Sequence, residues 1–229
     1  YIHNCELRLL SMNDGNEATI EGYGRLEFRN ATIMSWDAAA SAPAKEYPNR
    51  VWIFSKKNGG ALFNSRFVAL GSRSHRGVEI RFSGAGTETG YIVGCVFADV
   101  PRSPLLVGVP KKVFAQNRLT ESSSLRVGNA NCSVVEENVL DQMVHVAVAA
   151  EVVVRANTTT WAGWNGFCFD GSRNSLAIDH LVTACHHNGM QMSSGECFTP
   201  SSTVRFEVRG GSTSSAPSSS MKVERARVS

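Results

Sequence analysis

Short apolar stretches of two to four residues recur along the chain, and each ends in a turn residue or a polar residue. The clearest seven begin at Leu26, Ala61, Tyr91, Val113, Val134, Val152 and Leu176. An amphipathic helix would need apolar residues at i, i+3, i+4 and i+7, and no such series is sustained over three turns. The pattern therefore predicts an all-β chain of short strands separated by turns.

A polar anchor position marks each of these segments. The anchors are Asn30, Asn64, Cys95, Asn117, Asn138, Asn157 and His180. From Cys95 to His180 the steps are 22, 21, 19 and 23 residues, whereas the two steps upstream of Cys95 are 34 and 31. We attribute the longer steps to surface insertions within Trp36–Arg50, Gly71–Gly77 and Gly84–Gly90.

A repeated spacing of this kind is typical of a solenoid. A Greek-key β-sandwich also uses short strands between turns, but it has no reason to keep a constant anchor spacing. We therefore predict a right-handed, single-stranded parallel β-helix of about seven to eight coils. The stacked anchors are expected to form a hydrogen-bonded ladder at one corner of the coils.

The second half of each coil repeats as well, as two or three alternating apolar positions that end in a turn residue. These segments are Leu105–Gly108, Leu125–Gly128, Val144–Ala147 and Phe167–Gly171. The repeat fades after Cys197, and Gly210–Ser220 is rich in Gly, Ser, Thr and Pro. We expect one β-helix over residues 1–209 and a linker or tail over residues 210–229.

Composition excludes several classes of protein. The 229 residues are 42% hydrophobic and 19% charged, which is enough for one sizeable core. The formal charge of +3 is dispersed, without the basic stripe that nucleic-acid binding needs. Without an apolar run of about 18 residues, we expect no direct membrane insertion. Because Tyr1 opens directly into strand-like sequence, we expect a mature or excised piece of a longer protein.

Six cysteines are present, without a CxxC pair and without a His at zinc-finger spacing, so we predict no metal site and no cofactor. Cys95 and Cys168 lie in apolar strands and are expected to be buried free thiols. Cys185 and Cys197 flank a loop at a spacing that permits a disulfide.

Three N-glycosylation sequons occur, at Asn30, Asn131 and Asn157. Sequons of this number are compatible with a secreted glycoprotein, and a chain this rich in Asn, Ser and Thr reaches about the same number by chance.

Three stretches resemble the parallel β-helix region of fibrocystin-like proteins, the large ciliary and cell-surface proteins that have hyaluronan-degrading relatives. The stretches are Val78–Ser83, Gly90–Gly108 and Val113–Thr120, and the similarity extends over about Leu62–Leu140. The resemblance implies a β-helical scaffold in an extracellular, cell-surface or ciliary setting. The hyaluronan-degrading branch carries histidines where this chain has Glu79 and Arg81, so the resemblance does not extend to that activity.

A cluster of titratable residues lies late in the chain and comprises Asp170, Asp179, His180, His186 and His187, with Asp141 and His145 about one or two coils earlier. As a catalytic set, Asp170 and Asp179 would serve as acid and base with assistance from His186 or His187. As structural residues, Asp170 would belong to an Asp-Gly turn, and His186 and His187 to a polar corner. Trp161 and Trp164 flank a Gly-bearing turn, where they could stack on a sugar or a partner, or cap the interior.

Two functional hypotheses follow. The favoured one is a non-enzymatic structural or interaction module of a large extracellular protein, in which a stiff β-helix presents loops to neighbouring domains, subunits or glycans. The alternative is a carbohydrate-active β-helix, a lyase or epimerase that acts on an acidic polysaccharide with Asp170 or Asp179 as its acid or base.

Overall fold

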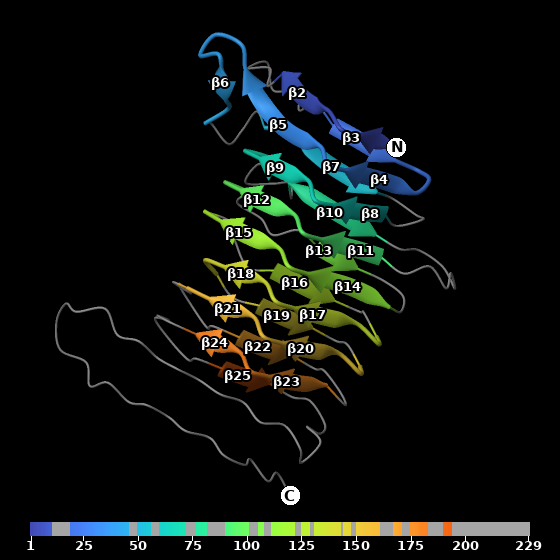
Figure 1. Ribbon diagram of the computed structural model, residues 1–229, viewed down its shortest axis with the longest axis vertical. Coiled ribbons are helices and arrows are strands. Elements are labelled where there is room, and N and C mark those ends of the chain that lie inside the picture. Colours follow the sequence, from blue (N-terminus) through green and yellow to red (C-terminus); the bar gives the residue numbers. More distant parts are fainter. Residues whose placement is uncertain are drawn as a thin grey trace, which may run out of the picture.

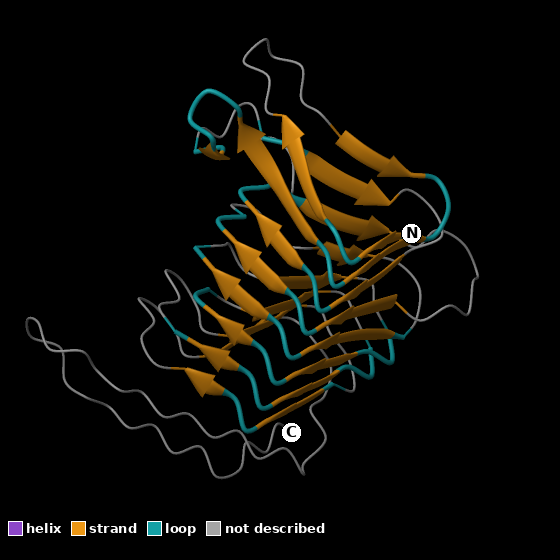
Figure 2. Ribbon diagram, turned by 45° about the horizontal axis from the view of Figure 1, so that its top comes forward, coloured by secondary structure: helices purple, strands orange, loops and turns teal. Residues whose placement is uncertain are grey.

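The computed structural model is built of β-strands in three sheets that run side by side along one axis (Figures 1 and 2). It describes residues 1–10, 19–45, 50–55, 60–71, 77–81, 90–100, 105–107, 111–121, 125–128, 131–142, 144–147, 150–160, 167–170, 175–182 and 190–193. The chain passes through sheets A, B and C in turn and then returns to sheet A one step further along the axis. The predicted right-handed parallel β-helix is confirmed, with eight coils in the described ranges.

Each coil contributes one strand to each sheet. Sheet A comprises β1 (Ile2–His3), β4 (Leu26–Arg29), β8 (Gly60–Phe63), β11 (Gly90–Val93), β14 (Lys112–Ala115), β17 (Val134–Glu136), β20 (Val153–Arg155) and β23 (Leu176–Ile178). Sheet B comprises β2 (Glu6–Leu10), β5 (Thr32–Asp37), β9 (Arg66–Val68), β12 (Val96–Ala98), β15 (Arg118–Thr120), β18 (Val139–Leu140), β21 (Thr158–Thr159) and β24 (Leu181–Val182). Sheet C comprises β3 (Thr19–Gly22), β7 (Trp52–Ser55), β10 (Val78–Arg81), β13 (Leu105–Val107), β16 (Leu125–Gly128), β19 (Val144–Ala147), β22 (Phe167–Asp170) and β25 (Met190–Ser193).

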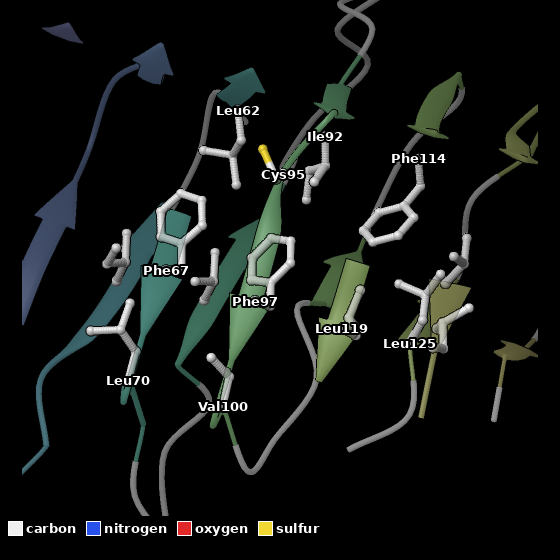
Figure 3. Packing of buried hydrophobic residues seen from close by; sticks show 14 of the residues in the cluster. Leu62, Phe67, Leu70, Ile92, Cys95, Phe97, Val100, Phe114, Leu119 and Leu125 are labelled. Carbon is white, nitrogen blue, oxygen red and sulfur yellow. The ribbon is translucent and has the colours of Figure 1, made fainter. Parts of the chain in front are cut away.

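The core is the interior of the coils, where inward side chains of successive strands stack in columns. On sheet B, the rings of Phe67 and Phe97 stack with centroids 5.0 Å apart, and Phe28 of sheet A meets Phe67 edge-on at 5.8 Å. Figure 3 shows side chains of sheets A and B that face one another across this interior, among them Leu62, Ile92, Phe114 and Leu119. These apolar columns explain why the sequence repeats an apolar strand in every coil.

The corner between sheets A and B repeats a two-residue turn. Its first residue has a positive φ in every coil: Asn4, Asn30, Asn64, Gly94, Gln116, Glu137, Ala156 and Asp179. Its second residue is Cys5, Ala31, Ser65, Cys95, Asn117, Asn138, Asn157 or His180, and all of these but Cys5 are buried. The corner thus offers one exposed left-handed position and one inward position per coil.

Gly94 shows how tightly consecutive corners stack. Its φ is +66°, and a Cβ built on it would lie 2.4 Å from Oδ1 of Asn64 in the preceding coil. The Asn64 side chain therefore occupies the space where a Cβ of residue 94 would lie. Only glycine combines a favourable positive φ with the absence of a Cβ.

A short antiparallel hairpin interrupts the repeat after β5. Strand β6 (Ala42–Pro43) pairs with the end of β5, inside the predicted insertion Trp36–Arg50. Arg50 is fully buried and donates to the carbonyl of Ala44, while its Nη2 lies 2.5 Å from Oδ2 of Asp99. Asp99 follows β12, two coils further along, so this ion pair fastens the hairpin to the side of the solenoid.

The described part of the chain includes no helix that is long and apolar enough to span a membrane. The predicted tail over residues 210–229 lies outside the described residues, so its separation from the β-helix stays a prediction.

Candidate functional site

The outer face of sheet C carries an exposed arginine between two core residues. Arg126 of β16 is exposed, whereas Leu125 and Val127 on either side are fully buried. The strand register pairs Arg126 with Leu105 in β13 and with His145 in β19. Because register partners in a parallel sheet share a face at about 4.8 Å, positions 126 and 145 are neighbours on the outside of the solenoid.

A second column runs beside the first, two residues further along each strand. The register pairs Gly128 with the buried Ala147, and Ala147 with Asp170 at the end of β22. Three adjacent strands therefore bring together a guanidinium-bearing position, an imidazole-bearing position and a carboxyl-bearing position, with two small residues beside them. This is a combination that can bind a carboxylate and transfer a proton.

An aromatic pair lies on the same face towards the N-terminus. Trp52 and Phe54 of β7 alternate with the buried Ile53 and Ser55, and their ring centroids are 5.5 Å apart at an interplanar angle of 49°. The register continues the column of Phe54 through Glu79 and Leu105 to Arg126. One line parallel to the axis thus joins the aromatic pair to Arg126 through a carboxyl-bearing and an apolar position, Glu79 and Leu105. A continuous line of this kind suits an extended polymer.

The carboxylates proposed from the sequence as a catalytic pair lie on different parts of the coil. Asp170 is in sheet C, whereas Asp179 is exposed at the corner between β23 of sheet A and β24 of sheet B. The structure does not bring these two residues together. His186 and His187 lie outside the described residues, as do Trp161 and Trp164 and the proposed pair Cys185 and Cys197. Within the described ranges, no group of three His, Cys, Asp or Glu residues could hold a metal ion.

Three asparagines form a hydrogen-bonded ladder inside the corner between sheets A and B. Nδ2 of Asn117 donates to Oδ1 of Asn138 at 2.9 Å, and Nδ2 of Asn138 donates to Oδ1 of Asn157 at 2.8 Å. Oδ1 of Asn117 accepts from the backbone N–H of Cys95 at 2.8 Å, which continues the series by one coil. His180 occupies the same buried position after Asn157. All five residues are inside the corner, so their role is in holding the coils together.

Asn30 and Asn64 are not in this inner ladder, so their placement there from the sequence is wrong by one residue. Both occupy the exposed left-handed position, and the inward residues of their coils are Ala31 and Ser65. Nδ2 of Asn30 donates instead to Oδ1 of Asn4 on the outside, at 3.1 Å. The error arises because asparagine suits both a left-handed corner and a buried ladder.

The sequons differ in accessibility. Asn157 is fully buried and its Nδ2 donates to the carbonyls of Val135 and Arg155, so the folded chain cannot carry a glycan there. Asn30 is exposed, with its Nδ2 bonded to Asn4. Asn131 is exposed, and its Oδ1 accepts from the N–H of Ala150. The structure therefore excludes Asn157 and leaves Asn30 and Asn131 exposed.

The described cysteines are free thiols in two environments. Cys95 and Cys168 are buried, and burial raises the pKa of Cys95 to about 12. Cys5 and Cys132 are exposed, and a hydrogen bond to Glu151 raises the pKa of Cys132. The pKa values of Cys95 and Cys132 are thus raised, the opposite of what a nucleophilic cysteine needs.

Comparison with solved structures gives two informative neighbours, both of the periplasmic alginate epimerase AlgG. A double mutant of AlgG matches with a TM-score of 0.54 and 16% identity, over 89% of this chain and 57% of that chain. AlgG itself matches with a TM-score of 0.53 and 18% identity, over 83% of this chain and 55% of that chain. The likeness shows a shared fold.

The chain spans little more than half the length of these neighbours. No protein-family model matches it, and neither does any curated protein sequence. The fibrocystin-like assignment is therefore not shown, although the parallel β-helix that it implied is present.

The sequence analysis singles out His145 and Asp170, but it misses Arg126 and the columns that join these positions on sheet C, although part of the signal was visible. Leu125-Arg126-Val127 and Val144-His145-Val146 each place one polar residue between two apolar ones, which marks a position on the outer face. The sequence alone does not determine the strand register, and it is the register that makes Arg126 and His145 neighbours.

Proposed function

We propose that this chain is a carbohydrate-active β-helix that binds an acidic polysaccharide along the outer face of sheet C. The observation that carries the proposal is the register that makes Arg126 and His145 direct neighbours and places Asp170 one strand further on. The solved neighbours add support, because they share the fold and act on the acidic polysaccharide alginate.

These positions suit chemistry at the carbon that bears the carboxylate of a uronate. A base removes the proton from this carbon, and the electron pair moves towards the carboxylate, which a guanidinium neutralises. Return of a proton to the opposite face gives the epimer. Departure of the sugar linked at the neighbouring carbon instead breaks its C–O bond, the leaving oxygen takes a proton from the acid, and a double bond remains, as in a lyase. We assign Arg126 to the carboxylate, and His145 and Asp170 to proton transfer.

The proposal also gives the chain an extracytoplasmic location, because polysaccharides of this kind lie outside the cytoplasm. The periplasmic location of AlgG is in line with this.

The test is turnover of a panel of uronate polymers in D₂O, followed by proton NMR. Deuterium at the carboxylate-bearing carbon reports epimerisation, and an unsaturated sugar reports lyase activity.

Arg126→Ala, His145→Ala and Asp170→Asn are expected to lower kcat/KM by at least about 100-fold. The matched controls are Arg118→Ala on sheet B, His3→Ala on sheet A and Asp179→Asn at the far corner. Absence of turnover on every polymer, or equal loss in variants and controls, overturns the proposal.

A second candidate is the structural module of a larger extracellular, cell-surface or ciliary protein that the fibrocystin-like resemblance implies. It is favoured by a row of half-buried apolar residues on the outer face of sheet A, formed by Val113, Val134 and Val153. Such a row fits contact with a neighbouring domain. An inactive chain whose Val134→Lys variant loses binding to that domain would favour this candidate over the enzyme.

A further inference from the structure

The N-terminal half of sheet A has a second group of polar and aromatic residues on its outer face, on a different sheet from the site above. In β4, Glu27 and Arg29 point away from the buried Phe28 that lies between them. The register continues the column of Arg29 to Phe63 in β8, and that of Glu27 through Ala61 to Tyr91 in β11. The group therefore extends over three adjacent strands, about 10 Å along the axis.

Charge in this group is arranged with the carboxylate inside and the guanidinium groups outside. The Glu27 side chain is 8% exposed, and it is bonded to Nε of Arg29 and lies 3.7 Å from Nε of Arg25. The side chains of Arg25 and Arg29 are 38% and 45% exposed. Hydrogen bonding to Arg29 outweighs burial and keeps the pKa of Glu27 below its ordinary value, so the carboxylate stays ionised. The surface therefore presents positive charge, although one negative charge lies beneath it.

The Arg29 guanidinium is fixed by two contacts, but its Nη groups remain available as hydrogen-bond donors. Its Cζ lies 4.2 Å from the centroid of the Phe63 ring, and its Nε bonds to Glu27. Within the described residues, the two Nη groups of Arg29 have no hydrogen-bond partner. A guanidinium oriented in this way can bind a carboxylate through two parallel hydrogen bonds.

An aromatic surface adjoins this guanidinium. The rings of Phe63 and Tyr91 are tilted by only 30° with centroids 5.8 Å apart, and Ala61 beside them is fully buried. Nearly parallel rings on a sheet face can pack against the apolar face of a pyranose, and a tyrosine hydroxyl can bond to a sugar hydroxyl.

We propose that Arg29, Phe63 and Tyr91 form a binding subsite for an acidic sugar, with its carboxylate on the Nη groups of Arg29 and its ring against Tyr91. Complementary charge and an adjoining ring face argue for a uronate rather than a protein partner. The subsite would hold a polymer chain away from the residues that transfer protons. The inference rests on the proposed function only for the class of ligand.

The test is calorimetric titration with an acidic uronate oligosaccharide and with a neutral oligosaccharide of equal length. Arg29→Gln and Tyr91→Ala are each expected to weaken uronate binding by about tenfold. Arg155→Gln is the matched control, because Arg155 lies in the same outward column and its Nε is bonded to Glu136, away from any described aromatic contact. Arg29→Lys keeps the positive charge but loses the planar pair of Nη donors, so it is expected to weaken binding less than Arg29→Gln. Thermal unfolding of each variant verifies that it is folded.

The outcomes separate this inference from the proposed function. Loss of uronate binding in Arg29→Gln but not in Arg155→Gln supports the subsite, even if no polymer is turned over. Equal affinities of Arg29→Gln and Arg155→Gln overturn it, as does equal affinity of the wild type for the neutral oligosaccharide. Binding that is abolished by Arg126→Ala alone also overturns it and leaves the sheet C proposal standing.

Discussion

Asn138 illustrates how a single buried residue joins three coils. Its Oδ1 accepts from the backbone N–H and the Nδ2 of Asn117, and its Nδ2 donates to the carbonyl of Phe114 and to Oδ1 of Asn157. Since the side chain is fully buried, each bond lost on truncation leaves an unsatisfied polar group.

Asn138→Ala is therefore expected to lower the free energy of unfolding by about 2–4 kcal/mol, measured by chemical denaturation. Asn30→Gly is the control, because it removes an exposed asparagine and keeps a residue that tolerates positive φ. It should change stability by less than about 0.5 kcal/mol. Equal losses in the two variants would show that the inner ladder adds nothing to stability.

Lys112 is a buried basic residue at the corner between sheets C and A. Desolvation lowers its pKa from 10.5 to about 8. The unfolded chain therefore binds the proton more tightly than the folded chain, and this lysine destabilises the fold most below pH 8. The penalty decreases as the pH rises from about 8 to 10.5.

Lys112→Met is expected to stabilise the chain at pH 7 by about 2 kcal/mol. The gain over the wild type should shrink as the pH approaches 10.5. Denaturation of both proteins between pH 7 and pH 10.5 measures the difference. A difference that is the same at every pH would contradict the account of Lys112.

At the scale of elements, the hairpin of β5 and β6 depends on a contact with a distant corner. Arg50 is buried, and both its Nη groups bond to Asp99, two coils along. A buried charge whose partner is removed is strongly destabilising.

Asp99→Asn is therefore expected to loosen the hairpin, and trypsin should cleave after Lys45 faster than in the wild type. Limited proteolysis with mass spectrometry measures the rate at this bond. Asp179→Asn is the control, because Asp179 also has a positive φ at an exposed corner but lies far from the hairpin. Cleavage after Lys45 at the wild-type rate in Asp99→Asn would refute the role of the ion pair.

The sequence predicts the elements of the fold well where coils carry no insertion. Between Cys95 and His180 the spacing identifies consecutive corners, because each coil needs nearly the same chain length to turn once. Upstream of Cys95 the spacing does not show that Asn30 and Asn64 lie at the outer corner position and not at the inward one, because asparagine is favoured at both positions.

The candidate sites are much less predictable than the fold. Arg126 and His145 are 19 residues apart, so a shift of one residue in register would separate them. Arg29, Phe63 and Tyr91 are joined across coils of unequal length that carry insertions. Such contacts depend on register, which spacing alone does not determine.

At the scale of the whole molecule, the chain forms a rod whose interior and outer faces have different roles. Its interior and its corners hold the coils together, through the apolar columns and the asparagine ladder. Its outer faces on sheets C and A are proposed to contact one acidic polymer. The outer face of sheet B carries Arg66 and Arg118 in one column, alternating with Val96 and Val139, without an aromatic residue in that column. We expect this column over β9, β12, β15 and β18 to take no part in binding.

The most direct test is an NMR titration of the ¹⁵N-labelled chain with an acidic uronate oligosaccharide, with a neutral oligosaccharide as the control. We predict that amide shifts concentrate in β16, β19 and β22 of sheet C and in β4, β8 and β11 of sheet A, and that the neutral sugar causes none. Shifts confined to sheet B, or no shifts with any uronate oligosaccharide, would contradict the claim that this β-helix acts on an acidic polysaccharide.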